Sequence, residues 1–65
     1  MESELRLRRV LAGVPQQAVA RRVGISQAEL SNIERGYRQP TPELAERIRV
    51  VIVELAKQGG GSVVS

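Results

Sequence analysis

The most versatile polar side chains in this sequence are the carboxamides of its central part, Gln16, Gln17, Gln27 and Asn32. A carboxamide both donates and accepts hydrogen bonds, so it can pair with N6 and N7 of an adenine in the major groove of DNA. Ala28 offers a methyl group that could contact a thymine methyl. An exposed amide is also an ordinary surface residue, so these residue types indicate DNA recognition only within a suitable structural frame.

Arginine dominates the charge of the chain. Ten Lys and Arg stand against seven acidic residues, all Glu, which gives a net charge of +3, and nine of the ten cations are Arg. A guanidinium forms two-pronged pairs with phosphate or guanine, whereas an ammonium group is a point charge. The excess of cations therefore permits an anionic partner, although a solvated surface would explain it equally well.

Enzymatic and metal-dependent functions find little support. The sequence contains no Cys, His or Asp, which removes thiolate and imidazole chemistry, Cys/His zinc sites and disulfides. Ser26 and Ser31 have no evident base, and there is no glycine-rich phosphate loop. The single aromatic residue, Tyr37, provides no platform for stacking single-stranded bases. We therefore expect no catalysis, no cofactor and no metal.

The length and hydropathy of the chain predict one small cytoplasmic domain. No apolar run approaches the roughly 18 to 20 residues that span a bilayer, and the charged N-terminus lacks the apolar core of a signal peptide. A domain of 65 residues buries only about 60% of the surface that its unfolded chain exposes. Self-association is a common way to bury more, so a homodimer is expected.

Glycine and proline divide the chain into four expected helices, at roughly 3–12, 16–23, 26–35 and 41–57. No segment is typical of a strand, so the sequence predicts an all-α domain over residues 1–57. The expected N-caps are Ser3, Ser26 and Thr41. The glycine run in residues 58–65 disfavours helix and predicts a flexible C-terminal tail.

The apolar residues of the last helix fall on more than one face. The core face repeats at i, i+3 and i+4 through Leu44, Ile48, Val51, Ile52 and Leu55. Val50 and Val53 lie outside this stripe, so either a partner chain covers them or they are exposed. Leu7 and Leu11 form a similar second stripe on the first helix, which could also face a partner.

The spacing of small and apolar residues between positions 16 and 36 predicts two helices that cross at an angle. Such a pair needs a small side chain at the contact and a short turn, often with Gly, and Ala20 and Gly24 supply them. A plain helical hairpin would require neither of them, nor a capping Ser two residues after the turn. The apolar residues that would hold the angle are Val19, Val23, Ile25, Leu30 and Ile33.

The segments ARRVGISQAELSNIERG, residues 20–36, and QPTPELAERI, residues 39–48, resemble the Xre and Cro family of helix-turn-helix regulators, which includes phage repressors. The resemblance extends over residues 5–55. It implies a compact lambda-repressor-like domain of four or five helices, in which helix 26–35 lies in the major groove of DNA. Two residues depart from the family pattern: Pro15 replaces the usual Ser or Thr, and Arg8 occupies a commonly apolar position.

The resemblance also assigns roles to individual residues. Inward Leu30 and Ile33 would orient helix 26–35 so that four of its residues face bases: Gln27, Ala28, Ser31 and Asn32. The expected phosphate contacts are Gln16, Gln17, Arg35, Tyr37 and Arg38. Arg9 and Glu34 occupy positions where family members often form a structural ion pair.

Two functions follow as expectations. The first is a transcriptional regulator, most simply a repressor, that binds a palindromic double-stranded DNA operator as a homodimer with Val50 and Val53 in the dimer interface. The second is a protein-interaction module of the antitoxin or anti-activator type, which would use the same fold to bind another regulator. Glu29, an acidic residue near the groove-facing end of helix 26–35, favours the second. Glu29 can equally be a capping-box acid or an acceptor for cytosine N4.

Overall fold

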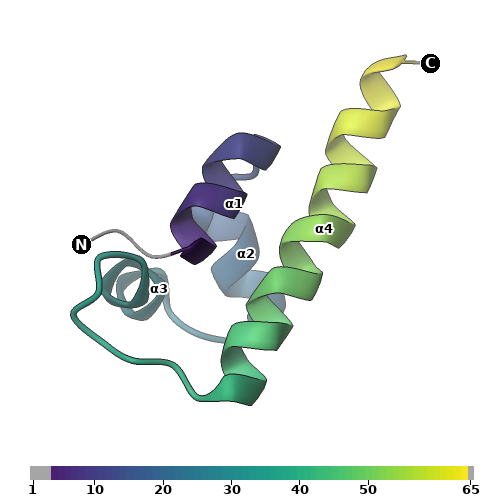
Figure 1. Ribbon diagram of the computed structural model, residues 1–65. Helices are drawn as coiled ribbons and strands as arrows, with labels where there is room; N and C mark the ends of the chain where they lie inside the picture. Colours follow the sequence, from purple (N-terminus) through teal and green to yellow (C-terminus); the bar gives the residue numbers. More distant parts are fainter. Residues whose placement is uncertain (1–3, 65) are drawn as a thin grey trace.

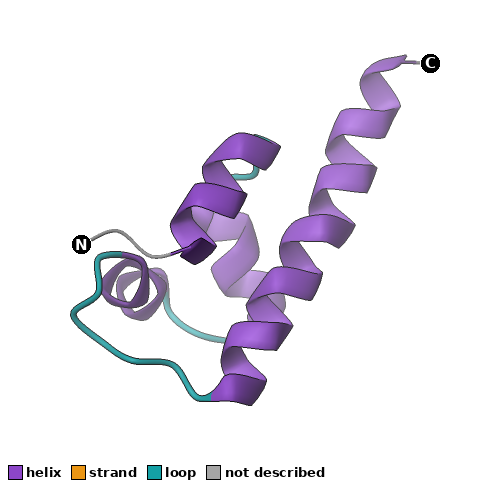
Figure 2. Cartoon of the chain, in the orientation of Figure 1, coloured by secondary structure: helices purple, strands orange, loops and turns teal. Residues whose placement is uncertain are grey.

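The computed structural model describes residues 4–64 and contains four α-helices (Figure 1). They are α1 (Glu4–Ala12), α2 (Gln16–Val23), α3 (Gln27–Glu34) and α4 (Pro42–Val64). No strand occurs within residues 4–64, as Figure 2 shows, which confirms the predicted all-α class. Ser3, the expected N-cap of the first helix, lies outside the described residues.

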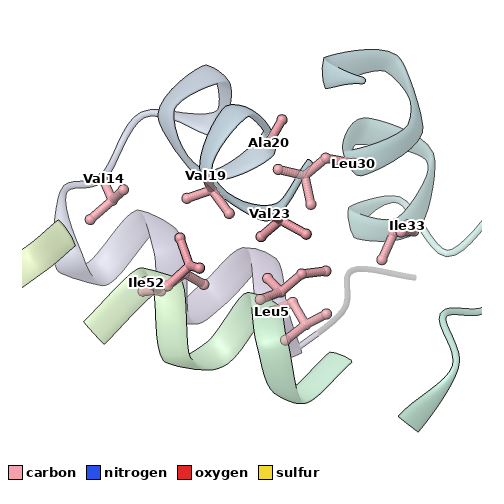
Figure 3. Close-up of a cluster of buried hydrophobic side chains, with 10 residues drawn as sticks. Leu5, Val14, Val19, Ala20, Val23, Leu30, Ile33 and Ile52 are labelled. Atoms are coloured by element: carbon pink, nitrogen blue, oxygen red, sulfur yellow. The ribbon is translucent and has the colours of Figure 1, made fainter. Parts of the chain in front are cut away.

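The long helix α4 packs against α1 and α2, and α3 packs mainly against α2 (Figure 1). The core between them consists of ten buried apolar residues: Leu5, Val14, Val19, Ala20, Val23, Leu30, Ile33, Ile48, Val51 and Ile52. Figure 3 shows these side chains converging from all four helices and from the α1–α2 turn. Burying one such side chain contributes about 1.5–3 kcal/mol, so this cluster holds the angles between the helices.

Two of the expected N-caps form as the sequence predicts. The Ser26 hydroxyl accepts a hydrogen bond of 3.0 Å from the backbone N–H of Glu29, and the Thr41 hydroxyl accepts one of 3.1 Å from the N–H of Leu44. Pro15 precedes α2 and makes no side-chain capping bond. The first turn of α2 is therefore left without a hydroxyl or carboxylate cap.

The turn between α2 and α3 depends on Gly24. Its φ of 96° and ψ of 26° place it in the left-handed region, and its N–H donates to the carbonyl of Ala20 at 2.9 Å. The N–H of Ile25 donates to the same carbonyl at 3.0 Å. Ala20 itself is only 2% exposed. The small residue and the glycine thus occupy the contact and the turn, where the sequence predicted them.

Arg8 is accommodated on the solvent side of α1. Its guanidinium donates to the carboxylate of Glu4, one turn earlier, at 2.7 and 2.9 Å. This hydrogen bond and the positive charge of Arg8 lower the pKa of the Glu4 carboxyl below its ordinary value. An arginine at a commonly apolar family position therefore leaves the core undisturbed.

Helix α4 extends further than expected. The sequence predicted a helix end near residue 57 and a flexible tail over 58–65, whereas α4 continues to Val64 and includes the glycine run. Glycine weakens a helix by about 1 kcal/mol per residue relative to alanine, but it keeps the backbone N–H and so permits the hydrogen-bond pattern to continue. The division into a domain and a tail remains a prediction.

Several large apolar side chains remain exposed to solvent. In the part of the chain with described side chains they are Leu7, Val10, Leu11, Tyr37, Val50 and Val53. Most belong to α1 and α4, the two helices with a second apolar stripe in the sequence. None of the helices in residues 4–64 has the length and apolar character required to cross a membrane.

Candidate nucleic-acid interface

The rotation of α3 about its axis is set by its buried side. Leu30 and Ile33 are 0% and 2% exposed and pack into the core, as Figure 3 shows. The opposite side of the helix consequently faces solvent and carries three exposed residues, Gln27, Ala28 and Asn32. Ser31, the fourth predicted base contact, is half-buried.

A buried ion pair joins α1 to the end of α3. Nε and Nη2 of Arg9 donate to the two carboxylate oxygens of Glu34 at 2.7 and 3.0 Å, and Nη1 donates to the carbonyl of Val14 at 2.9 Å. The side chain of Glu34 is only 2% exposed and that of Arg9 14%. This two-pronged geometry compensates the desolvation of both charges and fixes the position of the carboxylate.

The same carboxylate anchors the carboxamides of α2 and α3. Nε2 of Gln16 donates to Oε1 of Glu34 at 3.1 Å, and Oε1 of Gln16 accepts from Nε2 of Gln27 at 3.2 Å. Because a carboxamide nitrogen carries two hydrogens, the carbonyl and the second N–H of Gln27 remain for a base edge. We call the series Arg9, Glu34, Gln16 and Gln27 the amide relay; it runs from a buried charge to an exposed amide.

A polar pocket of about 220 Å³ lies beside the amide relay. Its lining residues are Arg6, Arg9, Gln16, Ser31, Glu34 and Arg35. Three arginines against one glutamate make the pocket suitable for an anion such as a phosphate. Arg6 was not among the contacts predicted from the sequence, although its spacing of three residues from Arg9 places both on one side of α1.

The loop after α3 folds back towards the start of that helix. The N–H groups of Tyr37 and Arg38 donate to the carbonyl of Asn32 at 2.9 and 3.2 Å. The guanidinium of Arg38 then lies 3.7 Å from the carboxylate of Glu29 in the first turn of α3. Tyr37 is 76% exposed. Glu29, the acidic residue near the groove-facing end of α3, thus has Arg38 as a cationic neighbour in its own chain.

The other predicted contacts are distributed around this surface or away from it. Gln17 is exposed at the first turn of α2, and Arg35 is exposed at the C-terminal end of α3. Val50 and Val53 are 44% and 49% exposed on α4, outside the surface formed by α2 and α3. Figure 1 shows α1 and α2 between α3 and the middle part of α4.

Comparison with known proteins agrees with this architecture. A family model described as helix-turn-helix matches residues 5–51, which include α1, α2, α3 and the first turns of α4. A search of curated proteins and a search of solved structures each gave no match. The match covers both helices of the angled pair and the turn between them. The chain therefore belongs to the Cro/C1-type helix-turn-helix family of DNA-binding regulators.

Proposed function

We propose that the protein is a sequence-specific regulator of transcription that binds a palindromic double-stranded operator as a dimer, with α3 of each copy in the major groove. The observation that carries this proposal is the amide relay, since it holds an exposed carboxamide at the N-terminal end of α3. A helix of this kind contacts base edges with its N-terminal residues. Occupation of an operator excludes other proteins from the same DNA, so repression is the simplest effect.

Three exposed residues of α3 provide the proposed base contacts. Gln27 has a free carbonyl and a free N–H for N7 and N6 of one adenine. Asn32 can form the same kind of pair with a second base, and Ala28 can contact a thymine methyl. Ser31 is half-buried at the edge of the polar pocket, so we assign it a contact at the margin of the groove.

The proposed phosphate contacts flank α3 on both sides. Gln16 and Gln17 begin α2, where the positive end of the helix dipole and the uncapped backbone N–H groups favour an anion. Arg35, Tyr37 and Arg38 follow α3 and would contact the backbone beyond the reading helix. Such contacts orient a protein on the duplex and contribute affinity without sequence preference.

A selection from a random duplex library at moderate salt tests the proposed function. The expected result is enrichment of a palindrome whose half-sites lie about 10 base pairs apart. Weak binding without enrichment, lost as salt rises, would mean attraction to phosphate alone and would contradict the proposal. In that event the protein-interaction alternative becomes the one to pursue, by identifying a partner regulator. A cytoplasmic location, where the operator would be accessible, is part of the proposal.

A further inference from the structure

Four residues of α4 form a line along its solvent-facing side: Glu46, Val50, Val53 and Lys57. Their spacing of four, three and four residues is that of a helix seam that packs against another helix. All four are exposed, and the two valines are 44% and 49% accessible. Together with Arg49 and Glu54 they line a shallow groove of about 360 Å³. We call these four residues the α4 seam.

The charges of the α4 seam favour one orientation of a second copy. The seam reads acid, valine, valine, base, so it is complementary to itself when reversed. In an antiparallel pair centred between Val50 and Val53, Val50 faces Val53 of the second copy and Glu46 faces Lys57. In a parallel pair, each charge would face its own kind. We propose that a second copy of this chain docks on the α4 seam in the antiparallel orientation.

The residues that flank the seam agree with this orientation. Arg47 and Glu54 lie on the same flank of α4, and residues on one flank meet across an antiparallel helix pair. In this antiparallel pair, Arg47 of one copy lies opposite residue 56 of the other, about two residues along the helix from Glu54. On the opposite flank, Arg49 has partners in its own chain, Glu46 at 3.2 Å and Glu4 at 3.8 Å. Arg49 contacts Glu46 only through Oε1, so the charge of Arg49 is compensated within its own chain while Oε2 of Glu46 is left for Lys57 of the second copy.

Apolar surface continues from the seam onto α1. Val53 also lines a second groove, of about 540 Å³, between α1 and α4, which contains Leu11 and Ile52 and has three cations at its edge. Leu11 is 77% exposed. A stable interface needs more than about 1,000 Å² of buried surface in total. The groove extends the apolar surface available to a second copy beyond the two valines of the seam.

This inference rests on the dimeric part of the proposed function, but it is tested without DNA. The dissociation constant of the dimer is measured by sedimentation equilibrium for the parent chain, Glu46→Lys, Lys57→Glu and the double variant. Each single reversal places like charges opposite each other twice per dimer and should weaken it about tenfold, equivalent to about 1.4 kcal/mol. The double variant restores both pairs and should return to within about threefold of the parent.

Net charge provides the control for this comparison. Lys57→Glu lowers the positive net charge of the chain, which by itself would reduce repulsion between two copies. A weaker Lys57→Glu dimer is therefore attributable to the seam. Arg21→Glu changes the net charge equally at an exposed position of α2 and should leave the dissociation constant within about twofold. If the double variant did not recover the dissociation constant of the parent dimer, the proposal would be overturned.

Cysteine cross-linking tests the orientation directly, because the native chain contains no cysteine. Positions 46 and 57 are about 16 Å apart along one helix, well beyond the limit of about 7 Å between the Cα atoms of a disulfide. The double variant Glu46→Cys/Lys57→Cys should therefore oxidise to a covalent dimer, and each single variant should not. Dimers from the single variants would show parallel helices and contradict the proposal.

A chain that stays monomeric at about 1 mM would also overturn the proposal. The duplex selection would then still show whether a single copy recognises one half-site. Loss of operator enrichment together with a normal antiparallel dimer would contradict the proposed function alone. The two failures are therefore distinguishable.

Discussion

Glu34 is the residue on which both the stability and the presentation of the candidate site depend. Its carboxylate is buried and accepts hydrogen bonds from Arg9 and Gln16. Glu34→Ala would leave the guanidinium of Arg9 desolvated without a counter-charge, which should cost about 3–5 kcal/mol of unfolding free energy. Urea denaturation followed by circular dichroism measures this loss.

The matched control for this variant is Glu4→Gln, which breaks an exposed pair with Arg8 and should change stability far less. If Glu34→Ala lost less than about 1 kcal/mol, the buried pair would not be a structural element of the fold.

Gln27 and Gln16 should affect DNA binding in different ways. Gln27→Ala removes the proposed base-contacting amide and should relax one position in each half-site, with a loss of about 1–3 kcal/mol of discrimination there. Gln16→Ala removes the hydrogen bond that supports this amide and also the proposed phosphate contact, so affinity should fall for all sequences and discrimination at the same position should weaken. Competition binding with single-base operator variants separates the two effects.

Gln58→Ala is the control for these two variants, because it makes the same change at an exposed position of α4. Equal loss of affinity for all operator variants in Gln27→Ala would exclude a base-reading role for this residue.

The positions of individual site residues could be predicted from the sequence to different degrees. The outward positions of Gln27, Ala28 and Asn32 follow from the inward positions of their apolar neighbours, a matter of helical periodicity. The hydrogen bond between Gln16 and Glu34 could not be foreseen in this way. It depends on how α2 and the end of α3 meet in space, and side chains 18 residues apart carry no periodic signal.

At the scale of elements, the angle between α2 and α3 depends on one backbone conformation. A Cβ at residue 24 would meet no atom within 4 Å, so the entire effect of Gly24→Ala should come from the left-handed φ of 96°. We expect a loss of about 1–2 kcal/mol in the free energy of unfolding. Gly24→Asn should lose less, since Asn tolerates this region better. Equal losses for Ala and Asn would show that φ is not the cause.

The end of α4 was less predictable than the other helix boundaries, since glycines with positive φ follow α1, α2 and α3 where the sequence predicted their ends. Ser26 and Thr41 predict helix starts, because each hydroxyl accepts a hydrogen bond from a backbone N–H that would otherwise have no partner. The end of α4 has no comparable signal. Glycines at 59–61 lower the helix propensity without removing a donor, and the preceding helix already provides the nucleus from which further turns can grow.

At the scale of the whole molecule, dimerisation and operator binding should be lost together. Val50→Glu and Val53→Glu place a charge in the proposed interface, while both sites are exposed and should leave the monomer folded. We expect weaker dimers in sedimentation and weaker binding to a palindromic operator. Val10→Glu is the control, because Val10 is 48% exposed on α1 and outside the α4 seam. An unchanged dimer in both α4 variants would place the interface elsewhere.

The amide relay also bears on how this protein could acquire a new operator. Gln27 is hydrogen-bonded, through Gln16, to the buried carboxylate of Glu34, so a replacement at position 27 loses a bond that orients its side chain. Ala28 and Asn32 are exposed on the same helix and lie outside the relay. Retargeting by evolution or by selection in the laboratory should therefore proceed first through positions 28 and 32. The base contacted by Gln27 should be the last to change among descendants of this domain.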